Sequence, residues 1–83
     1  MPGDGRPAFP SMKASRLLRV LRRKPLEYRV DRRSGSHRLL KSPNGYPDLR
    51  FSFHDGVELG PTIVRKILVN DVGLTEDEAA ELL

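Results

Sequence analysis

Two turn signals divide the middle of the chain into three short segments that are typical of β-strands. The segments cover residues 26–33, 37–42 and 48–54, and the turns between them are Ser34-Gly35 and the stretch 42–47, which is rich in proline, asparagine and glycine. Apolar and polar residues alternate within the segments, as in a strand with one buried face. In the last segment we expect one face to carry Leu49, Phe51 and Phe53, and the other to carry Arg50, Ser52 and His54. Tight turns between such segments predict an antiparallel three-stranded meander, with the phenylalanines in the core.

A helical pattern precedes the strands. A short leucine stripe predicts a helix over residues 13–24, which Pro25 ends because proline disfavours helical geometry in the residue before it. We expect Ser11 or Ser15 to cap its first turn. The remaining positions carry four arginines, which we expect to surround the helix rather than to share one site: Arg16, Arg19, Arg22 and Arg23.

Two more helices are predicted after the strands. Pro61 suits the first helical position, and the pattern continues through about Asn70 until Gly73 ends it. Its apolar face is expected to contain Ile63, Val64, Ile67 and Leu68. A capping box at residues 75–78 then predicts a short third helix that runs to Leu83.

The predicted order is therefore α-β-β-β-α with a short C-terminal helix. The simplest α+β arrangement covers one face of a three-stranded antiparallel sheet with helices and leaves the other face to Arg, Lys and His side chains. Double-stranded-RNA-binding domains share this layout, although a fold alone does not fix a function. Residues 1–11 contain three prolines and two glycines without periodicity, which indicates a disordered lead or a vector-derived remnant before a single domain over residues 12–83.

Positive charge is concentrated in the first part of this domain. Residues 13–50 contain twelve Lys or Arg and three Asp or Glu, whereas residues 55–83 contain two and seven. A surface with such an excess of cations attracts polyanions. We therefore expect one face to bind nucleic acid, and the acidic end to face solvent or another protein.

The composition also narrows the chemistry. The sequence contains no cysteine, and its two histidines, His37 and His54, lack the spacing of a metal motif. We therefore expect metal-independent chemistry without a cofactor. No apolar run reaches the roughly 18 residues of a membrane helix, and the N-terminus has no signal-peptide core. These features predict a soluble cytoplasmic protein with no membrane partner.

One short motif places a reactive group within the basic region. Ser34-Gly35-Ser36-His37 lies between two basic strand segments, and histidine takes and gives protons near neutral pH. A polyanion held by the flanking cations would have its own reactive groups beside the ring. RNA is the relevant polyanion because its 2′-hydroxyl is an internal nucleophile. We expect six residues around His37 to contact RNA: Arg32, Arg33, Gly35, Ser36, Arg38 and Lys41.

Several motifs occur in a fixed order along residues 12–83. They are Met12-Lys13 before the first helix, Gly35-Ser36-His37, Pro43-Asn44-Gly45, Glu58-Leu59, the run 62–68 and Gly73-Leu74-Thr75. In this order and spacing the chain resembles the HicA family of toxins. The resemblance implies a double-stranded-RNA-binding-like fold, cleavage of mRNA and neutralisation by a HicB antitoxin that covers the active site. It also implies that His37, in the Gly-Ser-His motif, is the catalytic histidine.

For the mechanism we expect His37 to act as general base or acid while a 2′-hydroxyl attacks the adjacent phosphate, giving a 2′,3′-cyclic phosphate or its hydrolysed form. His54 is a candidate for a second proton-transfer group, and its distance from His37 is open at this stage. One alternative function is a small, non-catalytic RNA-binding domain. A weaker one is a DNA-binding or regulatory module, because the basic first helix carries no asparagine or glutamine to read adenine.

Overall fold

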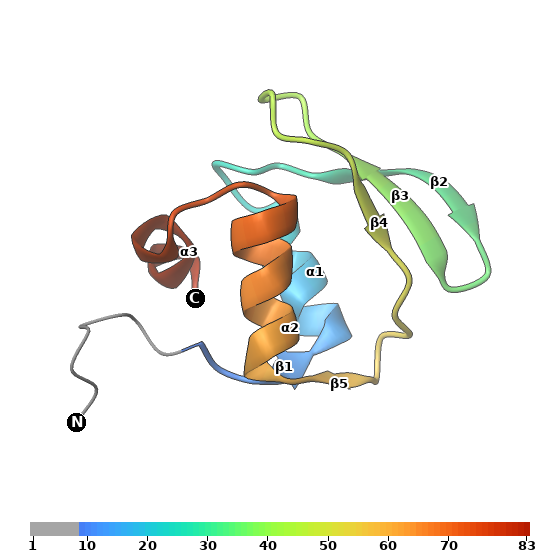
Figure 1. The fold of residues 1–83 in the computed structure, drawn as a ribbon. Coiled ribbons are helices and arrows are strands. Elements are labelled where there is room, and N and C mark those ends of the chain that lie inside the picture. Colours follow the sequence, from blue (N-terminus) through green and yellow to red (C-terminus); the bar gives the residue numbers. More distant parts are fainter. Residues whose placement is uncertain (1–8) are drawn as a thin grey trace.

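The three predicted strands form one antiparallel sheet in the middle of the chain. The computed structural model describes residues 9–83 and places β2 at Arg29–Ser34, β3 at His37–Lys41 and β4 at Leu49–Phe51 (Figure 1). Their order in the sheet is β2-β3-β4, and both pairs are antiparallel. The three-stranded meander is therefore confirmed, and with it the coarse α+β class.

Helices and one further pair of strands complete the fold. Helix α1 spans Ala14–Arg22, α2 spans Pro61–Arg65 and continues as the π-helix η1 over Lys66–Asp71, and α3 spans Glu76–Leu82. Two short strands that the sequence did not predict, β1 (Met12–Lys13) and β5 (Glu58–Leu59), pair antiparallel as a separate ribbon. This ribbon ties the start of α1 to the segment that precedes α2 (Figure 1).

The ribbon also changes how α1 is capped. The N-cap residue is Lys13 and no side chain caps the helix, so the prediction of Ser11 or Ser15 as the cap is wrong. The amides of Ala14 and Ser15 instead donate to backbone oxygens of residues 57 and 55, at 2.8 and 3.1 Å. Because the neighbouring chain satisfies these first amides, a serine cap has no donors left to bind there.

The first strand of the sheet begins later in the chain than the alternation of apolar and polar residues in 26–33 predicted. Strand β2 begins at Arg29 rather than at residue 26, because Glu27 has a left-handed backbone with φ of 52°. Leu26 and Tyr28 are nevertheless 0% and 1% exposed. The Tyr28 amide donates to the carbonyl oxygen of Leu21 at 2.9 Å. This stretch is therefore anchored to α1 and to the core, and it does not extend the sheet.

The signals for the later helices are confirmed, with one exception. Pro61 is the first residue of α2, and Gly73 follows η1 with φ of 94°. The Thr75–Glu78 capping box is present, with backbone-to-side-chain hydrogen bonds of 2.9 and 3.1 Å. The exception is Ile63, which is 39% exposed rather than part of the buried face. The buried positions of this helix are Val64, Ile67 and Leu68.

Helices α1 and α2 cover one face of the sheet and leave the other open (Figure 1). The core between them contains Leu17, Leu21, Leu40, Phe51, Val64 and Leu68, all almost completely buried. Phe53 is only half-buried at the margin of this core, where its ring lies 5.5 Å from that of Phe51. Phe9, within the predicted lead of residues 1–11, packs against the core. Residues 1–8 of that lead lie outside the described residues.

Tyr28 makes the stability of the protein sensitive to alkaline pH. Its hydroxyl donates to the carbonyl oxygen of Pro47. Burial raises the pKa of Tyr28 to about 12, with smaller contributions from Asp48 and Tyr46. An unfolded tyrosine ionises near pH 10, so the folded state holds the Tyr28 proton more tightly than the unfolded state does. The stability that this proton contributes to the folded state is complete below about pH 10 and is lost as the pH rises to about 12.

We expect the free energy of unfolding of the wild type to fall by about 2 kcal/mol over that interval, relative to Tyr28→Phe. Urea unfolding of both proteins across the interval measures the difference. Parallel pH profiles for the two proteins would contradict the expectation.

Candidate functional site

His37 lies at the start of β3, directly after the turn that joins it to β2. Gly35 has a left-handed φ of 60°, which glycine adopts without strain, and the chain reverses over the two residues of this turn. The turn pairs Ser34 with His37 across the hairpin. His37 is exposed to solvent. The imidazole therefore lies at the accessible end of a hairpin and not beneath the helices.

The strand register places the His37 side chain on the open face of the sheet. Residues directly opposite each other share a face, as do alternate residues along a strand. Arg32 is opposite Leu39, which is in turn opposite Arg50, so these residues form one row across the open face. The next row, toward the end of the hairpin, contains Ser34, His37 and, on the side of β4, Ser52.

A shallow groove lies over these two rows. Among the described residues, those that line it include four arginines, one histidine and no carboxylate: Arg32, Arg33, Ser34, His37, Arg38, Leu39, Arg50 and Ser52. Diagonal neighbours on a sheet face lie about 7–8 Å apart, within reach of long side chains. A phosphate beside the His37 ring would therefore be within reach of Arg32 and Arg50. Such a cationic groove favours an anionic ligand.

Arg50 and Ser52 belong to this groove although we did not select them from the sequence. The alternation within residues 48–54 placed both on one face of a strand. Only the pairing of β3 with β4, in which Leu39 is opposite Arg50, shows that His37 is on that same face. The alternation therefore indicates that Arg50 and Ser52 share a face, but the strand register is needed to place His37 on that face.

The other predicted RNA contacts divide between the groove and its surroundings. Arg32 has a side chain that is 84% exposed. Arg33 is exposed and borders the groove, although its register position is on the opposite face of the sheet. Lys41 is exposed on the open face, but at the far end of β3, about 13 Å along the strand. Gly35 and Ser36 form the turn, where Gly35 is exposed and Ser36 is half-buried.

The structure places Arg38 differently from the prediction. Arg38 borders the groove, but its side chain is only 8% exposed and shares the covered face with Phe51. Its Nη2 donates to Oδ1 of Asp55 at 2.8 Å, while Nε and Nη1 are buried without a partner among the described residues. Arg38 therefore links β3 to the loop that follows β4. This corrects the expectation that it offers an exposed guanidinium to a phosphate.

Removal of the Asp55 carboxylate should lower stability, because the buried Arg38 guanidinium then has no counter-charge. We expect Asp55→Ala to lower the free energy of unfolding by about 1–2 kcal/mol, because it leaves the Arg38 guanidinium with no ionic partner. Adding Arg38→Met should restore part of the loss, since methionine fills similar space without a charge. Urea unfolding of Asp55→Ala, Arg38→Met, the double variant and the wild type measures both effects. Losses that simply add would show that the pair is not coupled.

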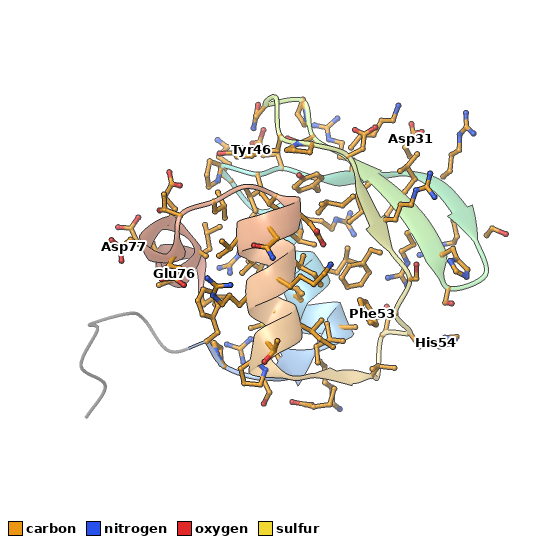
Figure 2. The ribbon with its side chains drawn as sticks, in the orientation of Figure 1. Asp31, Tyr46, Phe53, His54, Glu76 and Asp77 are labelled. Atoms are coloured by element: carbon orange, nitrogen blue, oxygen red, sulfur yellow. The ribbon has the colours of Figure 1, made fainter. Side chains whose placement is uncertain are left out.

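His54 lies apart from the groove. It follows β4 at the start of the loop to β5, is exposed, and points away from the body of the protein in Figure 2. It is not one of the residues that line the groove, which ends on this side at Ser52. Within the described part of the chain, His37 is thus the single imidazole that the groove contains.

A second basic surface lies on α1. A separate groove is lined by Arg16, Arg19, Val20, Arg23 and Leu83, and Arg23 donates to the carbonyl oxygen of Leu82 at 2.8 Å. Three of the four arginines therefore share one surface, whereas Arg22 does not line it, so the four do not form a single site. This surface has no residue in common with the groove around His37 and contains no histidine.

Within residues 9–83 no three His, Asp or Glu side chains converge as metal ligands do, and none of the helices has the length and apolar character of a membrane span. Comparison of the chain with protein-family models, curated proteins and solved structures gives no match. The function is therefore inferred from the residues of the groove and their arrangement.

Proposed function

We propose that this chain is an endoribonuclease that binds single-stranded RNA on the open face of its sheet and cleaves it with His37. The observation that carries the proposal is the position of the His37 imidazole. It is exposed, it lies between Ser34 and Ser52 in one row, and it has Arg32 and Arg50 on its two diagonals. A proton-transfer group between two arginines that can hold a phosphate suits RNA, because the 2′-hydroxyl nucleophile of RNA lies next to the phosphate that it attacks.

The proposed reaction needs one proton-transfer group beside the 2′-hydroxyl. The neutral His37 imidazole takes the 2′-hydroxyl proton, and the 2′-oxygen forms a bond to the adjacent phosphorus. The bond from phosphorus to the 5′-oxygen of the next nucleotide breaks, and that oxygen takes a proton from the imidazolium or from water. The products carry a 2′,3′-cyclic phosphate and a 5′-hydroxyl. Arg32 and Arg50 offset the charge that develops on the phosphoryl oxygens.

The order of elements and the sequence motifs support a narrower assignment within this proposal. The sheet with helices on one face and the α-β-β-β-α core suit a double-stranded-RNA-binding-like fold. Together with Gly35-Ser36-His37 they favour a HicA-like toxin that cleaves mRNA in the cytoplasm without a metal or cofactor and is neutralised by a HicB-like antitoxin.

A second candidate, an RNA-binding domain without catalytic activity, is favoured by one observation. Among the described residues, the lining of the groove contains one imidazole and no carboxylate, so no separate acid and base stand on either side of a phosphate. In this case the arginines would hold the backbone and His37 would be one more polar contact.

Incubation with RNA in the presence of EDTA separates the two candidates. The purified protein is mixed with an unstructured RNA and, separately, with DNA of the same sequence. We expect the RNA to be cut to fragments with 2′,3′-cyclic phosphate ends and the DNA to stay intact, since it lacks the nucleophile. RNA that is bound but never cut would leave only the second candidate.

A further inference from the structure

Strand β4 forms one edge of the three-stranded sheet, and a groove runs beside that edge. Because the sheet order is β2-β3-β4, the outer side of β4 has no neighbouring strand among residues 9–83. The groove lies between this edge and the helix formed by α2 and η1. Its lining consists of Leu49, Arg50, Phe51, Ser52 and Phe53 from the edge, and of Ile63, Lys66, Ile67 and Asp71 from the helix. An edge with open backbone groups accepts another extended chain.

The side of the groove toward the helices is apolar and incompletely covered. Ile63 is 39% exposed, and Phe53 is half-buried on the side of its segment that faces α2 (Figure 2). A strand added beside β4 would place the residues opposite Leu49 and Phe51 on this same side, since opposed residues share a face. These positions of an added strand would therefore be covered best by apolar side chains.

The other face of the edge is cationic. Arg50 is exposed and forms no ion pair with the described residues, whereas Lys66 at the helix side of the groove is already paired with Asp71 at 3.3 Å. The residue opposite Arg50 in an added strand would share its face and lie within about 5 Å of it at Cβ. An acidic side chain there would pair with a guanidinium that has no internal partner.

We propose that β4 and this groove bind an extended segment of a partner protein by strand addition. The expected segment reads apolar, acidic, apolar, polar, apolar, opposite Leu49, Arg50, Phe51, Ser52 and Phe53 in turn. Backbone hydrogen bonds to the edge supply affinity, and the alternate side chains supply specificity. This surface shares Arg50 and Ser52 with the groove around His37, but it is defined by the outer edge of β4, so its test needs neither RNA nor His37.

Selection from a phage-displayed library of random short peptides tests the proposal without RNA. We expect enriched peptides to alternate apolar and acidic or polar residues in this pattern. Ile63→Asp should weaken their binding about tenfold or more, because it puts a charge against their apolar side chains. Val57→Asp is the matched control, since Val57 is 40% exposed but does not line the groove. It should bind the peptides like the wild type.

Reversing the charge of Arg50 tests whether the acidic residue of the peptide lies opposite it, as the proposed register requires. Selection against Arg50→Glu should replace the acidic residue of the enriched peptides by Lys or Arg and keep the apolar positions. Circular dichroism verifies that each variant is folded. The proposal is overturned if no peptide is enriched, if the enriched peptides have a helical pattern, if both aspartate variants bind equally well, or if the edge is closed by a second copy of the chain, seen as a concentration-dependent dimer that Ile63→Asp dissociates.

Discussion

His37→Ala should lose RNA cleavage while it keeps its fold and most of its affinity for RNA. A positioned general acid or base typically contributes about 10²–10⁴-fold to a rate, and the groove contains no second imidazole among the described residues to replace it. His37 is an exposed residue at the start of β3, so its removal leaves the core intact. Single-turnover cleavage of a labelled RNA, with binding measured on the same preparation, gives the two quantities separately.

The second histidine provides a matched control. His54 is also exposed, but it lies beyond the groove, on the loop between β4 and β5. His54→Ala should therefore cleave at a rate close to that of the wild type. Undiminished cleavage by His37→Ala would remove His37 from the mechanism, and an equal loss in both variants would show that both rings take part.

Neutral substitutions of Arg32 and Arg50 should weaken RNA binding strongly. Each guanidinium is expected to hold a phosphate through a charge-assisted hydrogen bond, so Arg32→Gln and Arg50→Gln should each lower affinity about tenfold or more. Each lost phosphate contact should also reduce the slope of log affinity against log salt by about 0.7 for a single strand. Titration of a labelled RNA over a range of salt concentrations measures both changes.

The arginines of α1 are the control for nonspecific charge. Arg16→Gln and Arg19→Gln remove the same charge from the separate basic surface. We expect them to change the affinity for RNA little at moderate salt, because a substitution removes a phosphate contact only where the bound RNA lies against the protein. If the α1 variants weaken binding as much as Arg32→Gln and Arg50→Gln do, RNA does not lie on the open face of the sheet.

The elements that were predicted well are those specified by nearby residues. The turn signal at Ser34-Gly35, the capping box that starts at Thr75 and the stop at Gly73 depend on residues a few positions apart. The structure has the capping box and the stop, and it has the turn one residue later, at Gly35-Ser36. The choice of strands followed from alternation, which requires only that one face be buried. Local patterns of this kind predict whether a segment forms a helix, a strand or a turn, but they do not predict which other segment it packs against.

The elements that were missed depend on contacts between distant residues. The serine cap of α1 failed because Met12–Lys13 pairs with Glu58–Leu59, more than forty positions along the chain. Arg38 was expected to contact RNA because it is next to His37, but its guanidinium pairs with Asp55, 17 positions away, and is buried on the covered side of the sheet. The place of Arg50 beside His37 likewise required the register of β3 with β4. Alternation alone assigns faces within a strand and leaves this pairing undetermined.

The most direct measurement is an NMR titration of the isotopically labelled protein with a non-cleavable 2′-O-methyl RNA. If the RNA lies across the open face, the ring signals of His37 and the backbone amides of residues 32–39 and 50–52 should shift together. The signals of Arg16 and Arg19 on α1 and of Arg23 directly after it should stay in place. Large shifts on α1 with an unchanged His37 ring would contradict the assignment of the open face, and with it the role of His37 in cleavage.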